Sequence, residues 1–287
     1  MQYQRVRKII NIEKLRKKTV TIVGLGSLGS FTALLLAKNG VNLNLIDFDK
    51  VSVENLSSQI YSKNDIGRFK ADALEDYLRK LNPEIGIRSS KEKLDSSSIK
   101  ILDSDLVIDC TDNLETRFLI DSYCYRKIPW IHTAAIRTFG LVYVVNNSLS
   151  DLYNSDVSED LCDEHGILNS AAFMAASIAA TQAIKVLLNE PHEKNLIRFN
   201  IWNNAFDRIK VRPRKKKSIG IIKLCRNNYS INLGRRLNLD KIEKNNKVIF
   251  KNKNLIIIKP GIIINRNGYI IFENSSRGKI EKWLRSL

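Results

Sequence analysis

In the first part of the chain, segments with the apolar pattern of strands alternate with segments that have the apolar spacing of helices. The β-branched run at residues 19–23 is typical of a buried parallel strand, and residues 41–46 predict a second strand. Residues 27–39 have helical spacing and are followed by Gly40, a residue that commonly ends helices. These three segments predict one β-α-β unit, the element from which parallel sheets are built.

The same alternation continues to about residue 211. Residues 146–164 interrupt it as a polar stretch without an apolar period, which predicts a loop. The further elements that we expect are a helical stripe at 5–17, a helix at 65–81 stopped by Asn82-Pro83, a strand at 105–109, a helix at 116–126, strands at 130–134 and 140–145, a buried helix at 170–188 and a hairpin at 196–211. The pattern predicts an α/β fold, with a Rossmann-like, mostly parallel sheet and helices on both faces.

The remainder of the chain has a different pattern. A basic linker at 212–218 leads into short β-branched runs, with turn signals at Pro260-Gly261 and Asn267-Gly268 and a helix from Lys279. We therefore expect two domains. The large one covers residues 1–217, and a small α+β appendage covers residues 218–287.

Composition narrows the class of protein. The chain has 287 residues, 44% of them hydrophobic, which is enough for a packed core. No run of eighteen apolar residues and no secretory h-region is present, so we expect a cytoplasmic protein without a membrane span. The four cysteines are scattered and form no Cys-x-x-Cys pair, so we expect neither zinc nor a disulfide framework.

The net charge of +17 has two interpretations. One is a nucleic-acid or acidic-protein partner, and the other is a Lys-, Ile- and Asn-rich composition with solvated lysines. Much of the excess lies after Arg208, and so it says little about the catalytic part.

A glycine-rich turn is the first candidate for chemistry. Gly24-Leu25-Gly26-Ser27-Leu28-Gly29 follows a predicted strand and opens a predicted helix. Glycines let the backbone approach phosphates, and a helix N-terminus favours anions. Asp47, about twenty residues on, is placed to bind ribose hydroxyls. By itself this pattern indicates ATP or a dinucleotide and fits a dehydrogenase equally well.

Two further residues have functional and structural interpretations of their own. Lys70 is a suitable cation for phosphates or a solvated helix lysine. Asp112 follows a predicted buried strand, where a carboxylate can hold Mg²⁺ or cap the next helix. Both roles are compatible for Asp112.

A series of motifs distinguishes between the nucleotide enzymes. Asp47-Phe48-Asp49 is followed in order by Glu54-Asn55-Leu56-Ser57-Ser58-Gln59, Asp65-Ile66-Gly67-Arg68-Phe69-Lys70, Asn82-Pro83 and Asp109-Cys110-Thr111-Asp112-Asn113-Leu114-Glu115-Thr116-Arg117. From about Tyr3 to Val211 the chain resembles the ThiF/MoeB/HesA branch of the ubiquitin-activating-enzyme superfamily. The resemblance implies ATP-dependent adenylation of the C-terminal glycine carboxylate of a ubiquitin-like or sulfur-carrier protein ending in Gly-Gly.

The resemblance also implies roles for individual residues. Arg5 matches an arginine that relatives lend to the phosphates in the neighbouring subunit, which implies a homodimer. Arg5, Lys70, Asp112 and Cys162 are the catalytic candidates, and Asp112 is the Mg²⁺ candidate. The nucleotide-binding candidates are Gly24, Gly26, Ser27, Gly29, Asp47, Asp49, Asn55, Gln59, Lys70, Asp112 and Asn113.

This chain departs from the family pattern at two places. Ser58 stands where relatives have an arginine that contacts the phosphates, and Lys63 or Arg68 are the neighbouring cations that would compensate. The two zinc-binding Cys-x-x-Cys pairs of most relatives are absent near Leu152 and after Arg212, so no zinc is expected. Cys162 is either a nucleophile for thioester or persulfide chemistry or an inherited residue without a role.

Three alternatives remain beside adenylation. Ser58 and the missing zinc pairs are compatible with an inactive or scaffold subunit. The positive charge is compatible with an activating enzyme that acts on tRNA. An NAD dehydrogenase is disfavoured, because Asn55, Lys70 and Asp112 at these spacings have no role in hydride transfer.

Overall fold

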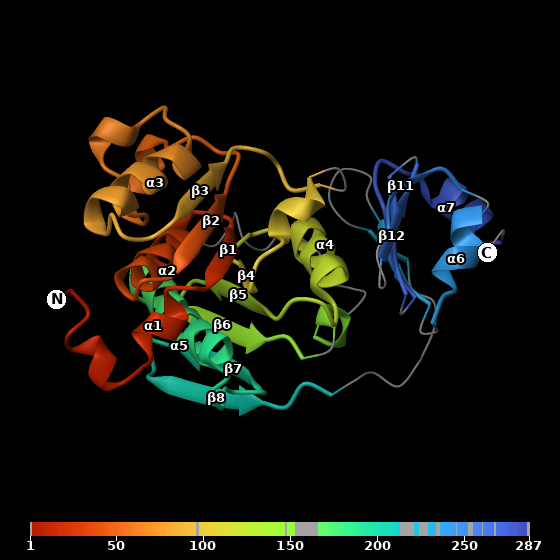
Figure 1. Ribbon diagram of the computed structural model, residues 1–287. Coiled ribbons are helices and arrows are strands. Elements are labelled where there is room, and N and C mark those ends of the chain that lie inside the picture. Colours follow the sequence, from red (N-terminus) through yellow and green to blue (C-terminus); the bar gives the residue numbers. More distant parts are fainter. Residues whose placement is uncertain are drawn as a thin grey trace.

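A computed structural model shows two β-sheets in one chain (Figure 1). It describes residues 2–95, 98–146, 148–152, 166–212, 221–223, 229–233, 236–244, 246–251, 255–259, 261–266 and 268–285. Cys162, the loop around it, Cys225 and the basic run at 214–217 lie outside the described residues.

The first sheet has eight strands in the order β3-β2-β1-β4-β5-β6-β7-β8. The first five are parallel, and β6, β7 and β8 continue the sheet antiparallel. Its strands are β1 (Thr19–Val23), β2 (Asn42–Ile46), β3 (Ile87–Ser90), β4 (Leu106–Asp109), β5 (Trp130–Ile136), β6 (Phe139–Val144), β7 (Leu196–Asn200) and β8 (Ala205–Ile209). The α/β, mostly parallel sheet predicted from the sequence is confirmed, although β3 was not anticipated.

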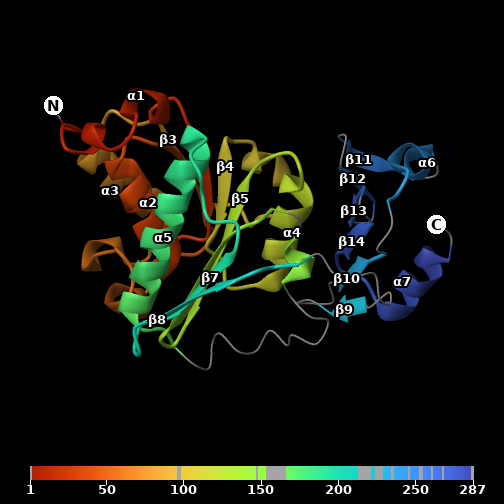
Figure 2. The same ribbon diagram turned by 90° about the horizontal axis from the view of Figure 1, so that it is seen from below.

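Helices cover both faces of this sheet (Figure 2). The helices α2 (Ser27–Lys38), α3 (Lys70–Leu81) and α5 (Asn169–Leu188) lie on one face, with the short α1 (Ile12–Leu15) beside α5, while α4 (Leu114–Cys124) lies on the other. Short 3₁₀ turns are η1 (Val6–Lys8), η2 (Val53–Ser57), η3 (Lys63–Asp65), η4 (Ile99–Leu102) and η5 (Leu149–Asp151). Right-handed crossovers explain why α2 and α3, which link β1 to β2 and β2 to β3, share a face.

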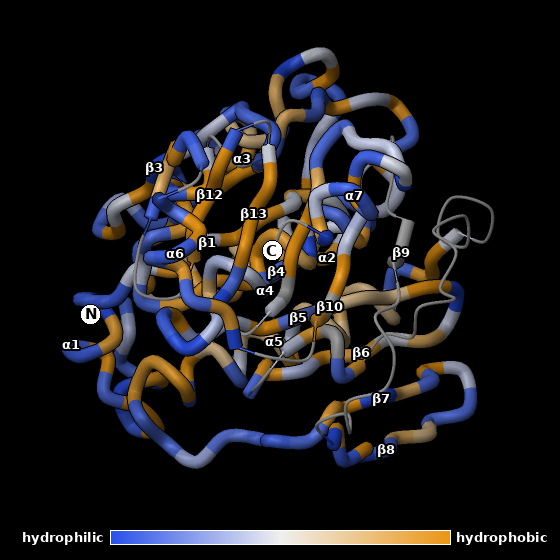
Figure 3. Tube along the Cα trace, turned by 90° about the vertical axis from the view of Figure 1, so that its right-hand side faces the viewer, coloured by the Kyte–Doolittle hydropathy of each residue, from blue (hydrophilic) through white to orange (hydrophobic). Residues whose placement is uncertain are grey.

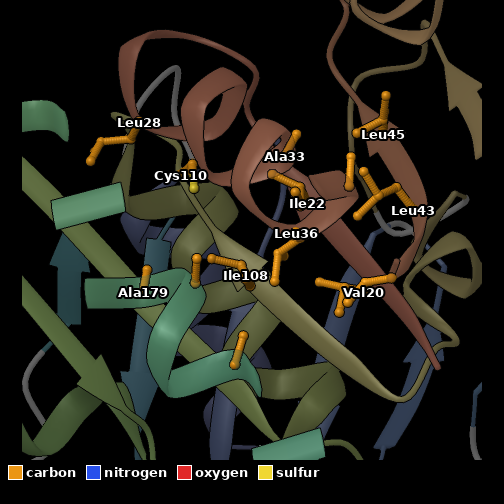
Figure 4. Close-up of a cluster of buried hydrophobic side chains, with 14 of the residues drawn as sticks. Val20, Ile22, Leu28, Ala33, Leu36, Leu43, Leu45, Ile108, Cys110 and Ala179 are labelled. Carbon is orange, nitrogen blue, oxygen red and sulfur yellow. The ribbon is translucent and has the colours of Figure 1, made fainter. Parts of the chain in front are cut away.

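The core on the α2 face forms between α2, α5 and the parallel strands (Figure 4). Alanines such as Ala175 and Ala179 let α5 approach the sheet closely, and the buried side chains from α2 and the strands include Val20, Ile22, Ala33, Leu36, Leu43, Leu45 and Ile108. Helix α5 is long and apolar enough by composition to cross a membrane, but 56% of its most apolar window is buried in this core. It therefore packs here as a core helix.

The second sheet is antiparallel, with the order β11-β12-β13-β14-β10-β9. It is formed by β9 (Ile221–Lys223), β10 (Tyr229–Asn232), β11 (Val248–Lys251), β12 (Leu255–Ile258), β13 (Ile262–Asn265) and β14 (Tyr269–Phe272), with helices α6 (Leu239–Lys244) and α7 (Arg277–Leu284). Gly261 and Gly268 adopt positive φ in its hairpins, as the turn signals predicted. The structure thereby shows the small α+β fold that was predicted for the last part of the chain.

Helix α4 shares its core with the second sheet. One face of that sheet, with Leu255, Ile257, Ile263 and Ile271, packs against Phe118, Leu119 and Tyr123 of α4 and their neighbours. The Asn265 side chain also donates a 2.9 Å hydrogen bond to the Ser122 carbonyl. The opposite face packs against Leu239 and Ile242 of α6 and Ile280 of α7. Figure 2 therefore shows five layers, in which α4 lies between the two sheets.

Several predicted helix bounds were wrong. The stripe at residues 5–17 is broken into η1 and α1, because the Asn11 side chain caps a new helix by accepting from Lys14 N. The helix predicted from Asp65 begins at Lys70, since Asp65 ends η3 and Gly67 takes a φ of +84°. Helix α4 begins at Leu114 rather than residue 116, because Asn113 caps it.

Candidate nucleotide site

The glycine turn forms as the sequence predicts, and its packing requires glycine. Gly24 has a φ of +85°, and a Cβ there would lie 2.7 Å from the Cys110 carbonyl oxygen. A Cβ on Gly29 would lie 1.8 Å from the Gly24 carbonyl oxygen, so α2 starts directly against the turn. Gly26 has open space beside it, with Gln59 as its nearest neighbour. Gly29 is thus a packing residue, while Gly26 exposes backbone to the cavity.

Asp47 ties this turn to the end of β2. Its carboxylate accepts hydrogen bonds from Leu25 N at 2.7 Å and from Asp49 N at 2.8 Å. Burial raises the pKa of Asp47, while the charge of Lys70 and the two backbone donors oppose that rise. The carboxylate therefore fixes the geometry of the turn as well as lining the cavity.

Lys70 is a buried cation at the start of α3. Only 7% of the residue is exposed, and its Nζ lies 3.0 Å from Asp49 Oδ2. Asp49 is about half exposed, and its backbone oxygen accepts from Lys70 N at 2.9 Å. Because Asp49 is open to water, its pairing leaves Lys70 able to turn towards a bound phosphate.

The end of β4 provides the opposite wall. Asp112 is exposed and lines the cavity. Asn113 Oδ1 accepts a 2.8 Å hydrogen bond from Thr116 N, so Asn113 rather than Asp112 is the helix cap. The capping alternative for Asp112 was wrong, and its carboxylate stays available to a ligand.

A buried polar network supports this wall from behind. Asp109 is fully buried, with His132 Nδ1 at 2.6 Å and Arg117 Nε at 3.5 Å from its Oδ2. Thr111 donates to Asp109 Oδ1 through both its backbone and its hydroxyl, and Arg117 donates to the Thr111 carbonyl.

The network also fixes the charges of its members. Burial alone would raise the pKa of Asp109, but the hydrogen bond from His132 and the charge of Arg117 lower it overall. Burial also lowers the pKa of His132, which favours a neutral imidazole that donates to an ionised Asp109.

These elements enclose a cavity of about 710 Å³ at the carboxyl ends of β1, β2 and β4. Such a position is where ligands bind in open α/β sheets. The cavity brings together most of the predicted nucleotide residues, namely Gly24, Gly26, Ser27, Asp47, Asp49, Gln59, Lys70, Asp112 and Asn113.

Three predicted site residues lie elsewhere. Asn55 does not line the cavity, because its side chain accepts from Ser52 N at 3.0 Å in a capping box that starts η2. Gly29 packs behind the turn, and Arg5 lies exposed beside η1, away from the cavity of its own chain. The catalytic candidate Cys162 lies outside the described residues.

The cations that line the cavity differ from those proposed to replace the missing arginine. Neither Lys63 nor Arg68 lines it, and Arg68 is held by Asp65 and Asp76. The lining cations are instead Lys70, Lys93 and Arg117. Lys93 and the Asp109–His132 pair were missed by the sequence analysis. Asp109 ends a buried strand and His132 is its register partner on the neighbouring strand, a pairing that the sequence does not signal.

The two described cysteines are structural. Cys110 and Cys124 are buried, and burial raises the pKa of Cys110 to about 12. Neither thiol is therefore a nucleophile at neutral pH. Among the described residues, no group of three or more His, Cys, Asp or Glu side chains is arranged to hold a metal ion.

Comparison with known proteins agrees with this geometry. The ThiF family profile matches residues 3–226. The chain belongs to the ThiF family. A similar curated relative is the molybdopterin-synthase adenylyltransferase of Escherichia coli, 33% identical over 214 residues, which span 69% of this chain and 85% of the relative. The enzyme of the same name from Haemophilus influenzae is 38% identical over 189 residues, which span 61% and 77%.

Solved structures show the same fold. The crystal structure of Escherichia coli MccB with succinimide has a TM-score of 0.64 and 20% identity, over 74% of this chain and 72% of that one. MccB with ATP has a TM-score of 0.62 and 21% identity, over 70% and 66%. The family profile and the curated relatives, rather than these structures, confirm the family and the enzyme class predicted from the sequence, an adenylyltransferase that uses ATP.

Proposed function

We propose that this ThiF-family chain adenylates the C-terminal glycine carboxylate of a small ubiquitin-like or sulfur-carrier protein that ends in Gly-Gly. The observation that carries the proposal is one cavity, onto which the glycine turn, Asp47 and Asp112 converge from three strand ends and Lys70 from the start of α3. The named relatives, molybdopterin-synthase adenylyltransferases, support a carrier protein as the substrate.

The reaction joins a carboxylate oxygen to the α-phosphorus of ATP and breaks the bond to the β-phosphate bridge, releasing pyrophosphate. Catalysis of this kind consists of positioning and charge neutralisation. Gly26 and Ser27 offer the helix N-terminus to the phosphates, and Asp47 meets the ribose hydroxyls. Lys70 exchanges Asp49 for a phosphate oxygen, so that its charge meets the negative charge that develops on the leaving group.

Mg²⁺ fits the donor set of this wall. Asp112 presents an exposed carboxylate to the cavity, and one carboxylate plus phosphate oxygens is a usual magnesium environment. When bound there, Mg²⁺ would supply charge for the phosphates. We propose no zinc, because the sequence has no Cys-x-x-Cys pair.

We further propose a cytoplasmic homodimer. Arg5 is exposed and does not line the cavity of its own chain, which supports its delivery to the cavity of a second copy. Cys162 remains a candidate for later thioester or persulfide chemistry.

Carrier-dependent pyrophosphate exchange tests the proposal. Purified chain, ATP, labelled pyrophosphate and each carrier encoded in the same genome should give exchange with one carrier. A carrier shortened by its last glycine is the matched control and should give none. Absence of exchange with every carrier would overturn the proposal.

Ser58 favours a second candidate, a subunit that needs an active relative. The cavity gains no cation from Ser58, Lys63 or Arg68, so one family contact to the phosphates is missing. In that case exchange would appear only after a second ThiF-family chain is added, whereas exchange by the chain alone excludes this candidate.

A further inference from the structure

Positive charge is concentrated in the C-terminal part of the chain. Residues 218–287 contain 15 Lys and Arg against 4 Asp and Glu, a net charge of +11, whereas the three times longer residues 1–217 contain 32 against 26, a net charge of +6. A Lys-rich composition imposed on the whole chain would raise both parts alike. The excess of positive charge is therefore a property of the appendage, which points to a binding partner of the appendage as its cause.

The described cations lie on the helices that cover the outer face of the second sheet. Helices α6 and α7 lie on the side of the second sheet away from α4 (Figure 1), and many of their residues are hydrophilic (Figure 3). Ile242 and Ile280 face the sheet, while Lys241 and Lys244 on α6 are exposed. On α7, Lys279 and Lys282 are likewise exposed and three residues apart. Side chains at this spacing are neighbours on a helix surface, so each helix presents a pair of adjacent cations.

The carboxylates on α6 and α7 form ion pairs with other cations than these four lysines. In the described part of the appendage, the ion pairs join Lys251 to Asp240 and Glu243, and Arg277 to Glu281. None of the ion pairs between described residues includes Lys241, Lys244, Lys279 or Lys282. We call these four residues, on α6 and α7, the basic face.

The basic face lacks the anchors of a protein interface. Among the described residues after 220, the exposed large hydrophobic side chain is Ile249, on the edge strand β11. Interfaces between proteins depend on buried aromatic and apolar anchors, whereas interfaces with nucleic acid are more polar and much more positive. None of the side chains that the structure describes as exposed after residue 220 is aromatic, which also disfavours stacking on unpaired bases.

We propose that the basic face binds double-helical nucleic acid through its phosphate backbone, without reading the bases. The inference goes beyond adenylation and does not depend on it. The proposed anionic ligand is a regular array of phosphates, which both duplex RNA and duplex DNA present.

The test measures binding of the full-length chain to fluorescein-labelled duplexes of about 20 base pairs by fluorescence anisotropy, between about 50 and 200 mM salt. The variant Lys244→Glu/Lys279→Glu/Lys282→Glu is compared with Lys17→Glu/Lys38→Glu/Lys80→Glu, whose lysines are exposed on the other part. Both triple variants change the net charge equally. Thermal unfolding followed by circular dichroism checks that both are folded.

We expect the first variant to bind about tenfold more weakly or worse at about 50 mM salt, and its salt slope to fall by about 2.7, near 0.9 for each lost phosphate contact. The control should change by less than about threefold. Binding of RNA alone, DNA alone or both supports the proposal and identifies the source of the phosphates.

Three outcomes would overturn it. Equal weakening in both triple variants would show that only net charge matters. Tighter binding of polyglutamate or of anionic vesicles than of either duplex would assign the face to an acidic protein or a membrane. Wild-type chain that leaves both duplexes unbound at about 50 mM salt would also refute it.

Discussion

The two sheets of this chain differ in where they leave room for chemistry. In the first sheet β1, β2 and β4 run parallel, so their carboxyl ends meet at one edge, and the cavity opens there. In the second, tight turns join β12 to β13 and β13 to β14, α4 covers one face and α6 and α7 cover the other, and every residue that lines the cavity lies at or before Ile167. The parallel sheet thus leaves an open edge where a ligand can bind, whereas the antiparallel sheet leaves only the outer surface of the helices that cover it.

Ile257 tests whether the second sheet is a separate unit. It is fully buried on the face towards α4, and Ile257→Ala should lower the free energy of unfolding by about 2–5 kcal/mol in denaturant titrations. The control Ile249→Ala, on the edge strand and 46% exposed, should change it by less than about 0.5 kcal/mol. If the second sheet unfolds in a separate transition and the chain still binds ATP, the two sheets do not unfold cooperatively despite their shared core.

Lys70 tests the assignment of chemistry to the first sheet. Lys70→Ala should reduce pyrophosphate exchange about a hundredfold to a thousandfold, because one charged contact to the phosphates is lost. Lys80→Ala on the same helix and Lys282→Ala on the appendage should leave it within about twofold. A comparable loss in Lys282→Ala would mean that the second sheet takes part in the reaction.

His132 tests how far the buried network supports the cavity wall. His132→Ala leaves the Asp109 carboxylate without a 2.6 Å partner and should cost about 1.5–3 kcal/mol of unfolding free energy. His132→Asn retains a side-chain N–H and should recover part of that loss. ATP titrations should show weaker binding in the alanine variant alone, since Thr111 depends on Asp109. If both variants bind ATP equally well, the network contributes to stability and not to ATP binding.

Asp121 is a buried carboxyl on α4, between the two sheets. Burial raises the pKa of this carboxyl to about 7, against a 2.8 Å hydrogen bond from the Ser148 hydroxyl. Because the folded chain holds a proton that the unfolded chain has released, Asp121 contributes stability at acid pH that is lost as the pH rises through about 7.

Asp121→Asn removes this titration. Its unfolding free energy relative to wild type should therefore increase between about pH 5 and pH 8. Parallel pH profiles for the two proteins would show that Asp121 does not titrate in that range.

Local patterns predicted most of the fold and part of the site. The strands and the glycine turn depend on neighbours in the sequence, and so β1, α2 and β2 formed where the pattern placed them. The Asp109–His132 pair depends on two strands lying side by side, which no local pattern specifies. Asn55 is the opposite case, in which a local interaction decides the position of a motif residue. Its side chain forms a capping box with Ser52, which the family resemblance did not reveal.

The position of α4 has a consequence for synthesis. The ribosome makes α4, whose capping residue Asn113 adjoins Asp112 of the cavity wall, well before residues 255–271 that cover its outer face. A nascent chain therefore passes through a stage in which Phe118 and Leu119 lack their packing partners on the second sheet. Chains that stall before the second sheet is translated therefore expose an apolar helix face to chaperones and proteases.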